Sequence, residues 1–153
     1  MKATWLDEER ELSTDELLKN NVYYAALPTD PALFQGAINV LMNERGYVQQ
    51  DEVALAPTTP NIDAICNKFV DEHFHDDDEV RFVLEGEGIF DIRSRDDRWM
   101  RVLVQEGDLI VVPAARHHRF MLTESKSIRC VRLFKDASGW VPHYREAEAP
   151  APL

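Results

Sequence analysis

The pattern of hydrophobic and polar residues changes near residue 70, from helical spacing before it to strand-like alternation after it. The first part predicts three short helices, each introduced by a capping residue or a proline. The polar residues 1–10 are expected to be loosely ordered, and the pattern assigns no element to residues 47–60. The helices are expected to begin at residues 13–16, to follow Asp30 as far as a turn at 43–46, and to run from 62 to 69 behind an Asn61 cap.

Beyond residue 70, short apolar runs are separated by turn signals, which is typical of β-strands. Residues 85–88 read as the turn of a hairpin between the first two strands. Strands at this spacing favour an antiparallel sandwich or barrel. No internal repeat or linker indicates a second domain, so we expect one domain over residues 11–146 and a disordered tail at 147–153. The strands are expected at 80–84, 89–93, 99–104, 109–112, 118–122 and 128–134.

Four residues that could carry chemistry share one parity where the strands begin: His73, His75, Glu79 and Arg81. A strand turns every second side chain to one face, so all four can face one cavity, whereas a helix would point His73 and His75 to nearly opposite sides. Imidazoles and a carboxylate suit a divalent transition metal such as iron, nickel, manganese or zinc. The alternative is a solvated acidic turn with surface histidines. The opposite face would carry Phe74, Val80, Phe82 and Leu84.

A further imidazole ligand is expected from a later strand, and His117 and His118 compete for this position. They lie on opposite faces of the strand, and Phe120 and Leu122 share the parity of His118, which favours His118 as the inward residue. His117 is then expected at the rim or on the surface. His143 follows a proline in a loop-like region and is expected on the surface.

Arg81 has two interpretations on this face. Its guanidinium is suited to bind an anionic substrate beside a metal, or it could pair with Glu79 or Glu72. Glu72 has the wrong parity for the metal and is expected to orient a ligand imidazole from behind. Three aromatic residues could line an apolar pocket, or could belong to the core: Phe69, Phe120 and Trp140.

The composition narrows the class of partner. A chain of 153 residues can bury a core of its own, so a metal would be functional rather than a folding aid. The net charge of −11 argues against nucleic acids and anionic membranes, because phosphate binding needs clustered basic residues. Cys66 and Cys130 read as reduced core thiols. Without a secretory signal, transit signal or membrane span, a soluble intracellular protein that binds a small molecule is expected.

Several motifs together resemble the cupin family of acireductone dioxygenases. They are Glu-His-Phe-His at 72–75, Asp-Glu-Val-Arg-Phe at 78–82, Leu-Glu-Gly-Glu-Gly at 84–88, Gly-Asp-Leu-Ile at 107–110 and His-Arg-Phe at 118–120. The resemblance implies a mainly β fold, a single cupin jelly-roll barrel with a few short N-terminal helices packed outside. The chain departs from the family at His117, where an aromatic residue is common, and in its short N-terminus.

The resemblance also implies roles for individual residues. One metal ion per chain, Fe²⁺ or Ni²⁺, would be bound by His73, His75, Glu79 and His118. The motif places its fourth ligand immediately before Arg-Phe, which selects His118 over His117. Arg81 would be the catalytic residue that contacts the substrate anion. Pocket positions of the family correspond to Phe69, Phe120, Arg132 and Trp140.

The implied reaction cleaves acireductone, a dihydroxy-keto-methylthiopentene, with O2 to formate and 4-methylthio-2-oxobutanoate, a step of methionine salvage. The nickel form would give formate, carbon monoxide and methylthiopropionate. A cytoplasmic monomer is expected, present also in the nucleus if the source is eukaryotic. The alternatives are a cupin dioxygenase that acts on another substrate and a non-catalytic cupin that binds a metal or a small molecule.

Overall fold

The chain folds into a β-sheet with three helices, and the computed structural model describes residues 1–135 and 142–145. The elements in chain order are β1 (Lys2–Trp5), α1 (Thr14–Lys19), β2 (Tyr23–Ala26), α2 (Pro31–Arg45), β3 (Gln49–Leu55), α3 (Ile62–Phe69), β4 (His73–Phe74), β5 (Glu79–Arg93), β6 (Trp99–Gln105), β7 (Asp108–Val112), β8 (His118–Leu122), β9 (Ile128–Phe134) and β10 (His143–Tyr144).

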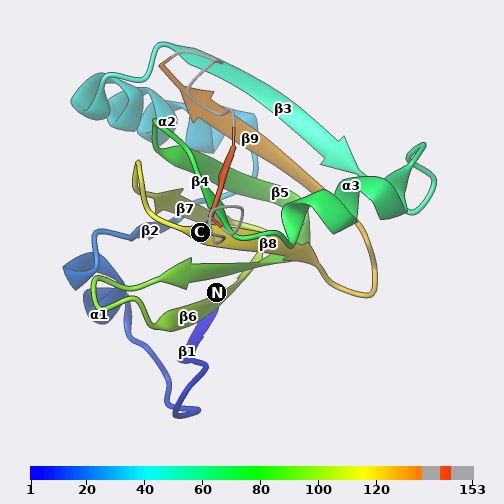
Figure 1. The fold of residues 1–153 in the computed structure, drawn as a ribbon. Coiled ribbons are helices and arrows are strands. Elements are labelled where there is room, and N and C mark those ends of the chain that lie inside the picture. Colours follow the sequence, from blue (N-terminus) through cyan, green and yellow to red (C-terminus); the bar gives the residue numbers. More distant parts are fainter. Residues whose placement is uncertain (136–141, 146–153) are drawn as a thin grey trace.

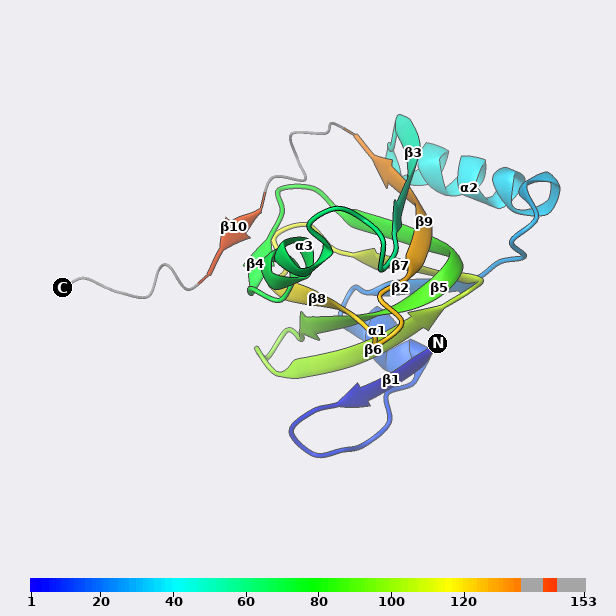
Figure 2. The same cartoon turned by 90° about the vertical axis from the view of Figure 1, so that its right-hand side faces the viewer.

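The strands form one antiparallel sheet that folds into two halves (Figure 1). One half has the order β1-β6-β5-β8-β4-β10, and the other has the order β2-β7-β5-β9-β3. Strand β5 belongs to both halves. Figure 2 shows α2 outside the sheet beside β3 and β9, and α3 beside β4 and β8. The sheet therefore encloses an interior and the helices lie outside it, as expected for a barrel.

Strand β5 runs unbroken through residues 85–88, so the hairpin predicted there is wrong. Gly86 has a φ of +80°, and the pairing of β5 with β9 shifts register between Val83 and Glu85, which marks a bulge. A Cβ atom on Gly86 would lie 2.1 Å from the carbonyl oxygen of Ser127, so the position requires glycine. The glycine bends the strand instead of ending it. Beyond the bend, β5 leaves β7 and β9 and pairs with β6 and β8.

The three helices occur where the capping signals predicted them. In α1, the Ser13 hydroxyl accepts from the Glu16 amide and the Glu16 carboxylate accepts from the Ser13 amide, a capping box. In α2, Asp30 caps the first turn, and Gly46 closes the last turn with a left-handed φ of 77°. Helix α3 has the predicted bounds and Asn61 occupies its N-cap position, but the Asn61 side chain makes no capping hydrogen bond.

Helix α2 buries one face against the outer side of β5 and β9. Phe34 packs edge-on against Phe82 with ring centroids 5.0 Å apart, and Ile38 is fully buried. Val80, Phe82 and Leu84 all lie in this hydrophobic cluster. Burying side chains of this size contributes about 2 kcal/mol each. The cluster confirms that the apolar residues of this stretch face away from the chemical ones.

The expectation of a loosely ordered N-terminus is wrong. Strand β1 pairs with β6, with Ala3 opposite Val102 and Trp5 opposite Met100. Ala3 and Trp5 are buried, and the Arg98 guanidinium lies 3.9 Å from the centroid of the Trp5 ring. Two apolar residues in alternation beside an acidic run are too short a signal to indicate a strand. The sequence pattern likewise missed β2 and β3, which are edge strands paired with β7 and β9.

Three predictions concern residues outside the described ranges: the role of Trp140, the domain end at residue 146 and the tail at 147–153. Within the described ranges, none of the helices has the length and apolar character that crossing a membrane requires.

Candidate metal centre

The four predicted metal ligands lie close together in the space between the two halves of the sheet. His73, His75, Glu79 and His118 are all buried, and their ligand atoms lie within 4.8 Å of one another. His73 comes from β4, Glu79 begins β5 and His118 begins β8. His73 and His118 are direct partners in the pairing of β4 with β8. The structure thus brings together residues that are 45 positions apart in the sequence.

The parity argument gives the right residues through a different backbone. The chain leaves β4 after Phe74 and enters β5 at Glu79, so His75 and the acidic run between them form a connection rather than a continuous strand. Asp78 holds this connection in place, because its carboxylate accepts hydrogen bonds from the Tyr47 hydroxyl and from the Ala114 amide. Burial and the Asp78 carboxylate raise the pKa of Tyr47 above its usual value. The acidic run is therefore an anchored loop and not simply a solvated turn.

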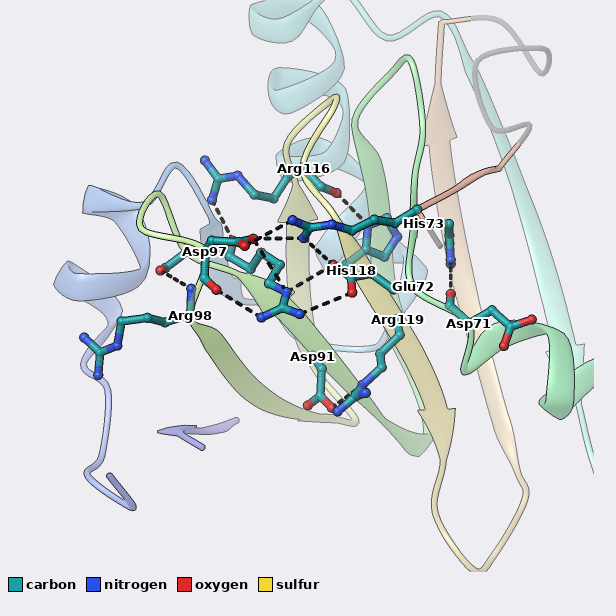
Figure 3. A network of polar contacts seen from close by, with 12 residues as sticks. Asp71, Glu72, His73, Asp91, Asp97, Arg98, Arg116, His118 and Arg119 are labelled. Atoms are coloured by element: carbon teal, nitrogen blue, oxygen red, sulfur yellow. Dashed lines mark hydrogen bonds and ion pairs between the residues drawn. The ribbon is translucent and has the colours of Figure 1, made fainter. Parts of the chain in front are cut away.

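Backbone carbonyls orient two of the imidazoles. Nδ1 of His73 lies 2.7 Å from the carbonyl oxygen of Asp71, and Nδ1 of His118 lies 3.0 Å from that of Arg116 (Figure 3). An Nδ1–H that donates to a carbonyl leaves the Nε2 lone pair available for a metal. Burial and the neighbouring His118 lower the pKa of His73 to about 4, so this imidazole is neutral at pH 7.

Glu79 lies between the imidazoles and the guanidinium of Arg81. Its Oε1 atom is 2.9 Å from Nε2 of His75 and 3.3 Å from Nε2 of His118, and its Oε2 atom is 3.2 Å from Nε of Arg81. Burial opposes ionisation, but the charge of Arg81 and the neighbouring His118 and His75 side chains outweigh it and hold the pKa of Glu79 well below its usual value. The donor set therefore has a carboxylate and imidazole nitrogens, which fits a divalent transition metal.

Arg81 combines both interpretations made from the sequence. It pairs with Glu79, its Nη1 atom lies 3.5 Å from Sγ of the buried Cys130, and it lines the cavity beside the ligand cluster. Its guanidinium carbon is also 5.9 Å from the centroid of the Phe120 ring. A guanidinium in this position can donate hydrogen bonds to an anion in the cavity while it balances the Glu79 charge.

Glu72 does not orient an imidazole, which corrects the expectation. Its carboxylate accepts hydrogen bonds from Arg93 at 3.0 and 3.3 Å and from Arg145 at 2.7 Å. Arg145 binds Asp97 as well, at 2.9 and 3.1 Å. Figure 3 shows Glu72 directed into this network and away from the His73 ring. The reason is that neighbouring side chains of an extended chain point in opposite directions, and backbone carbonyls already orient His73 and His118.

A cavity of about 440 Å³ adjoins the ligand cluster. Phe69, Phe120 and Arg132 line it, as the resemblance implied, and Phe69 packs edge-on against Phe120 at 5.6 Å. Arg132 pairs with Asp51 of β3. The sequence analysis did not identify the other lining residues. The larger apolar side chains at positions 53 and 55, on either side of residue 54, were a signal for a strand with one face toward the site. These residues are Val53, Ala54, Leu55, Lys68, Pro142 and Tyr144.

The two remaining histidines lie outside the ligand cluster, as predicted. His117 is partly buried and packs edge-on against Phe74 with ring centroids 5.1 Å apart. His143 is exposed, stacks on the Phe74 ring with ring centroids 4.8 Å apart, and lies 3.1 Å from a carboxylate oxygen of Asp76. Strand parity therefore selected the inward member of the 117–118 pair correctly.

Comparisons with known proteins agree with this site. The family model described as the ARD/ARD' family matches residues 3–142. The chain is similar to an acireductone dioxygenase of Heterostelium pallidum, with 44% identity over 97% of this chain and 100% of that protein. It is also similar to one of Dictyostelium discoideum, with 43% identity over 93% of this chain and 97% of that protein.

A solved structure has the same fold. It is an acireductone dioxygenase from Bacillus anthracis with a cadmium ion in its active centre, 28% identical, with a TM-score of 0.88 over 94% of this chain and 97% of that chain. This likeness confirms the predicted fold class, a cupin jelly-roll barrel with helices outside. With a family model that spans nearly the whole chain and relatives matched from end to end, the chain belongs to the ARD/ARD' family.

Proposed function

We propose that this protein is a metal-dependent dioxygenase that cleaves an acireductone with O2. The observation that supports the proposal most directly is the buried group of His73, His75, Glu79 and His118 beside a cavity that also contains Arg81, in a chain of the ARD/ARD' family. One ion per chain would be bound by these four side chains. The products would be formate and 4-methylthio-2-oxobutanoate, as a step of methionine salvage.

The charges of the site suit an anionic substrate. Bound at these four side chains, a divalent metal would supply a Lewis-acid centre with about one unit of uncompensated positive charge, because Glu79 is the one anionic residue among them. Arg81 adds a second positive charge in contact with Glu79. A substrate that enters as an enediolate therefore neutralises charge that the buried site would otherwise carry alone.

Arg81 has the main role toward the substrate in this proposal. Its guanidinium lines the cavity, where it donates hydrogen bonds to an enediolate oxygen and favours the deprotonated form. Phe69 and Phe120 add apolar surface to the cavity lining, which excludes water and suits the methylthio tail. The polar and apolar parts of the lining thus correspond to the two ends of the substrate.

We further propose Fe²⁺ as the ion of the methionine-salvage reaction, with Ni²⁺ giving formate, carbon monoxide and methylthiopropionate. First-row divalent ions share these ligands, so availability decides which ion is bound. The cadmium ion in the active centre of the Bacillus anthracis relative supports a site for a single divalent ion in this fold.

The test is oxygen uptake with an acireductone, measured on protein loaded with Fe²⁺ or with Ni²⁺ and combined with product analysis. His75→Ala should lose the metal and oxygen uptake, whereas His143→Ala, a histidine outside the ligand cluster, should retain both. Metal-loaded protein that binds the acireductone without consuming oxygen would instead identify a non-catalytic binding protein. Activity that does not depend on metal would contradict the proposal outright.

A further inference from the structure

Three cationic side chains line the cavity, and they differ in how their charges are balanced: Lys68, Arg81 and Arg132. Arg81 pairs with Glu79, and Arg132 pairs with Asp51. Over residues 1–135 and 142–145, Lys68 makes no ion pair with a carboxylate. Among these three cations, the ammonium group of Lys68 is therefore the one whose charge is not balanced by a carboxylate of the described residues.

The structure holds Lys68 at the mouth of the cavity. Lys68 lies in the last turn of α3, which Phe69 anchors by packing edge-on against Phe120 of β8. The carbonyl of Lys68 accepts a hydrogen bond from the Asp71 amide at 3.3 Å, which directs the chain into β4. Figure 2 shows α3 beside β4 and β8. The position of Lys68 thus depends on packing that also builds the pocket.

Tyr144 connects Lys68 with the ligand cluster. Nζ of Lys68 is 5.6 Å from the centroid of the Tyr144 ring, a cation–π contact. The Tyr144 ring in turn lies 5.8 Å from the His73 ring. The ammonium group is therefore one aromatic ring away from a metal-binding imidazole, and it is exposed to solvent at the entrance.

A positive charge at the cavity entrance offsets the repulsion between this acidic chain and an anionic substrate. The net charge of −11 repels an anionic substrate at long range, while a local positive charge at the mouth of a cavity raises the rate of capture. We propose that Lys68 recognises the anionic enediolate at the entrance and draws it into the cavity. This inference rests on the proposed function, and it assigns Lys68 to substrate recognition rather than to the chemical step.

The test compares Lys68→Met, which removes the charge and retains an apolar stem on Tyr144, with Lys68→Arg, which retains the charge. Lys2→Met is the matched control, because Lys2 is exposed on β1, at the opposite end of the sheet order from β10, and the net charge changes equally. We expect Lys68→Met to lower kcat/KM about fivefold at low ionic strength through KM, with kcat and metal content unchanged. The deficit should shrink at about 0.3 M salt. Lys68→Arg and Lys2→Met should resemble the wild type.

A role in packing alone would give a different result. If Lys68→Met and Lys2→Met show the same kcat/KM and the same salt dependence, the proposal is wrong. It is equally wrong if Lys68→Arg is as impaired as Lys68→Met. Calorimetric binding of ascorbate, a stable enediolate, to the metal-loaded proteins separates this inference from the proposed function. Wild-type protein that consumes no oxygen contradicts the proposed function, whereas charge-dependent ascorbate binding still decides the role of Lys68.

Discussion

Replacing Gly88 by alanine should narrow the cavity from behind Phe120. Gly88 lies on β5, and a Cβ atom there would be 2.6 Å from two ring atoms of Phe120 and 3.2 Å from Cδ1 of Ile128. Carbon atoms in contact are usually about 3.5–4.0 Å apart, so the ring must move by about 1 Å. Phe69 and Phe90 already pack against the ring at 5.6 and 4.8 Å, so the displaced ring intrudes on the cavity.

The energetic cost follows from these contacts. Overpacking a core position costs about 1–3 kcal/mol, and the lower chain entropy of unfolded alanine returns up to about 1 kcal/mol. We therefore expect Gly88→Ala to lower the free energy of unfolding by about 1–2 kcal/mol, which is roughly 2–8 °C in melting temperature for a chain of this size. The displaced ring should also raise KM for the acireductone, with metal content unchanged.

The assay is urea unfolding together with steady-state oxygen uptake, and Gly36→Ala is the matched control. Gly36 lies in α2, and apart from the helix's own nearby backbone no atom is within 4 Å of the position that its Cβ would take. Alanine should therefore raise the unfolding free energy there, by about 0.5–1 kcal/mol. If both glycine variants unfold at the same or higher urea concentration than the wild type and have unchanged KM, the reasoning about Phe120 is refuted.

Three further predictions address the site and its surroundings. Arg81→Met should lower kcat by about 10-fold to 100-fold and leave bound metal nearly constant, because the metal still balances Glu79; loss of metal, measured by elemental analysis, would show a purely structural role. Arg145→Met should raise KM without changing kcat, since it loosens the segment that carries Tyr144 into the cavity lining, and an unchanged KM would count against this. Metal-free protein should lose stability as the pH falls, because the pKa of His73 is about 4 in the folded protein and near 6.5 when unfolded, so the unfolded chain binds the proton more tightly. Urea unfolding should show a loss of about 2 kcal/mol between pH 7 and pH 5, and constant stability over that range would be inconsistent with a buried neutral imidazole.

The local sequence pattern was sufficient to predict side-chain orientation where one face of a strand is apolar and the other carries the candidate site residues. The alternation of Glu79 and Arg81 with Val80 and Phe82 predicted both the cavity side and the core side of β5. The pattern is clear because one side lines the cavity and the other side packs in a hydrophobic cluster. The same reasoning failed at Gly86, since a glycine that bends a strand looks like a glycine that ends one. Only the partner strands distinguish the two cases.

Contacts between distant segments account for what the sequence did not indicate. Tyr144 reaches the cavity because β10 pairs with β4, and Arg145 then binds Glu72 and Asp97. A two-residue strand has no period of its own, so its position comes entirely from its partners. Glu72 was misassigned for a related reason, because the two arginines that bind it lie 21 and 73 residues away.

The bent strand β5 has a consequence for how the protein unfolds. Its residues are hydrogen-bonded to β7 and β9 in one half of the sheet and to β6 and β8 in the other, so neither half can open without breaking bonds to it. Its amide protons should accordingly be among the slowest to exchange with solvent, at the rate of global unfolding. Glu79 is its first residue, and the ligand cluster should disassemble only when the whole barrel does. Release of the ion would then be coupled to unfolding of the whole sheet. Removing the ion should therefore lower the melting temperature of the entire chain.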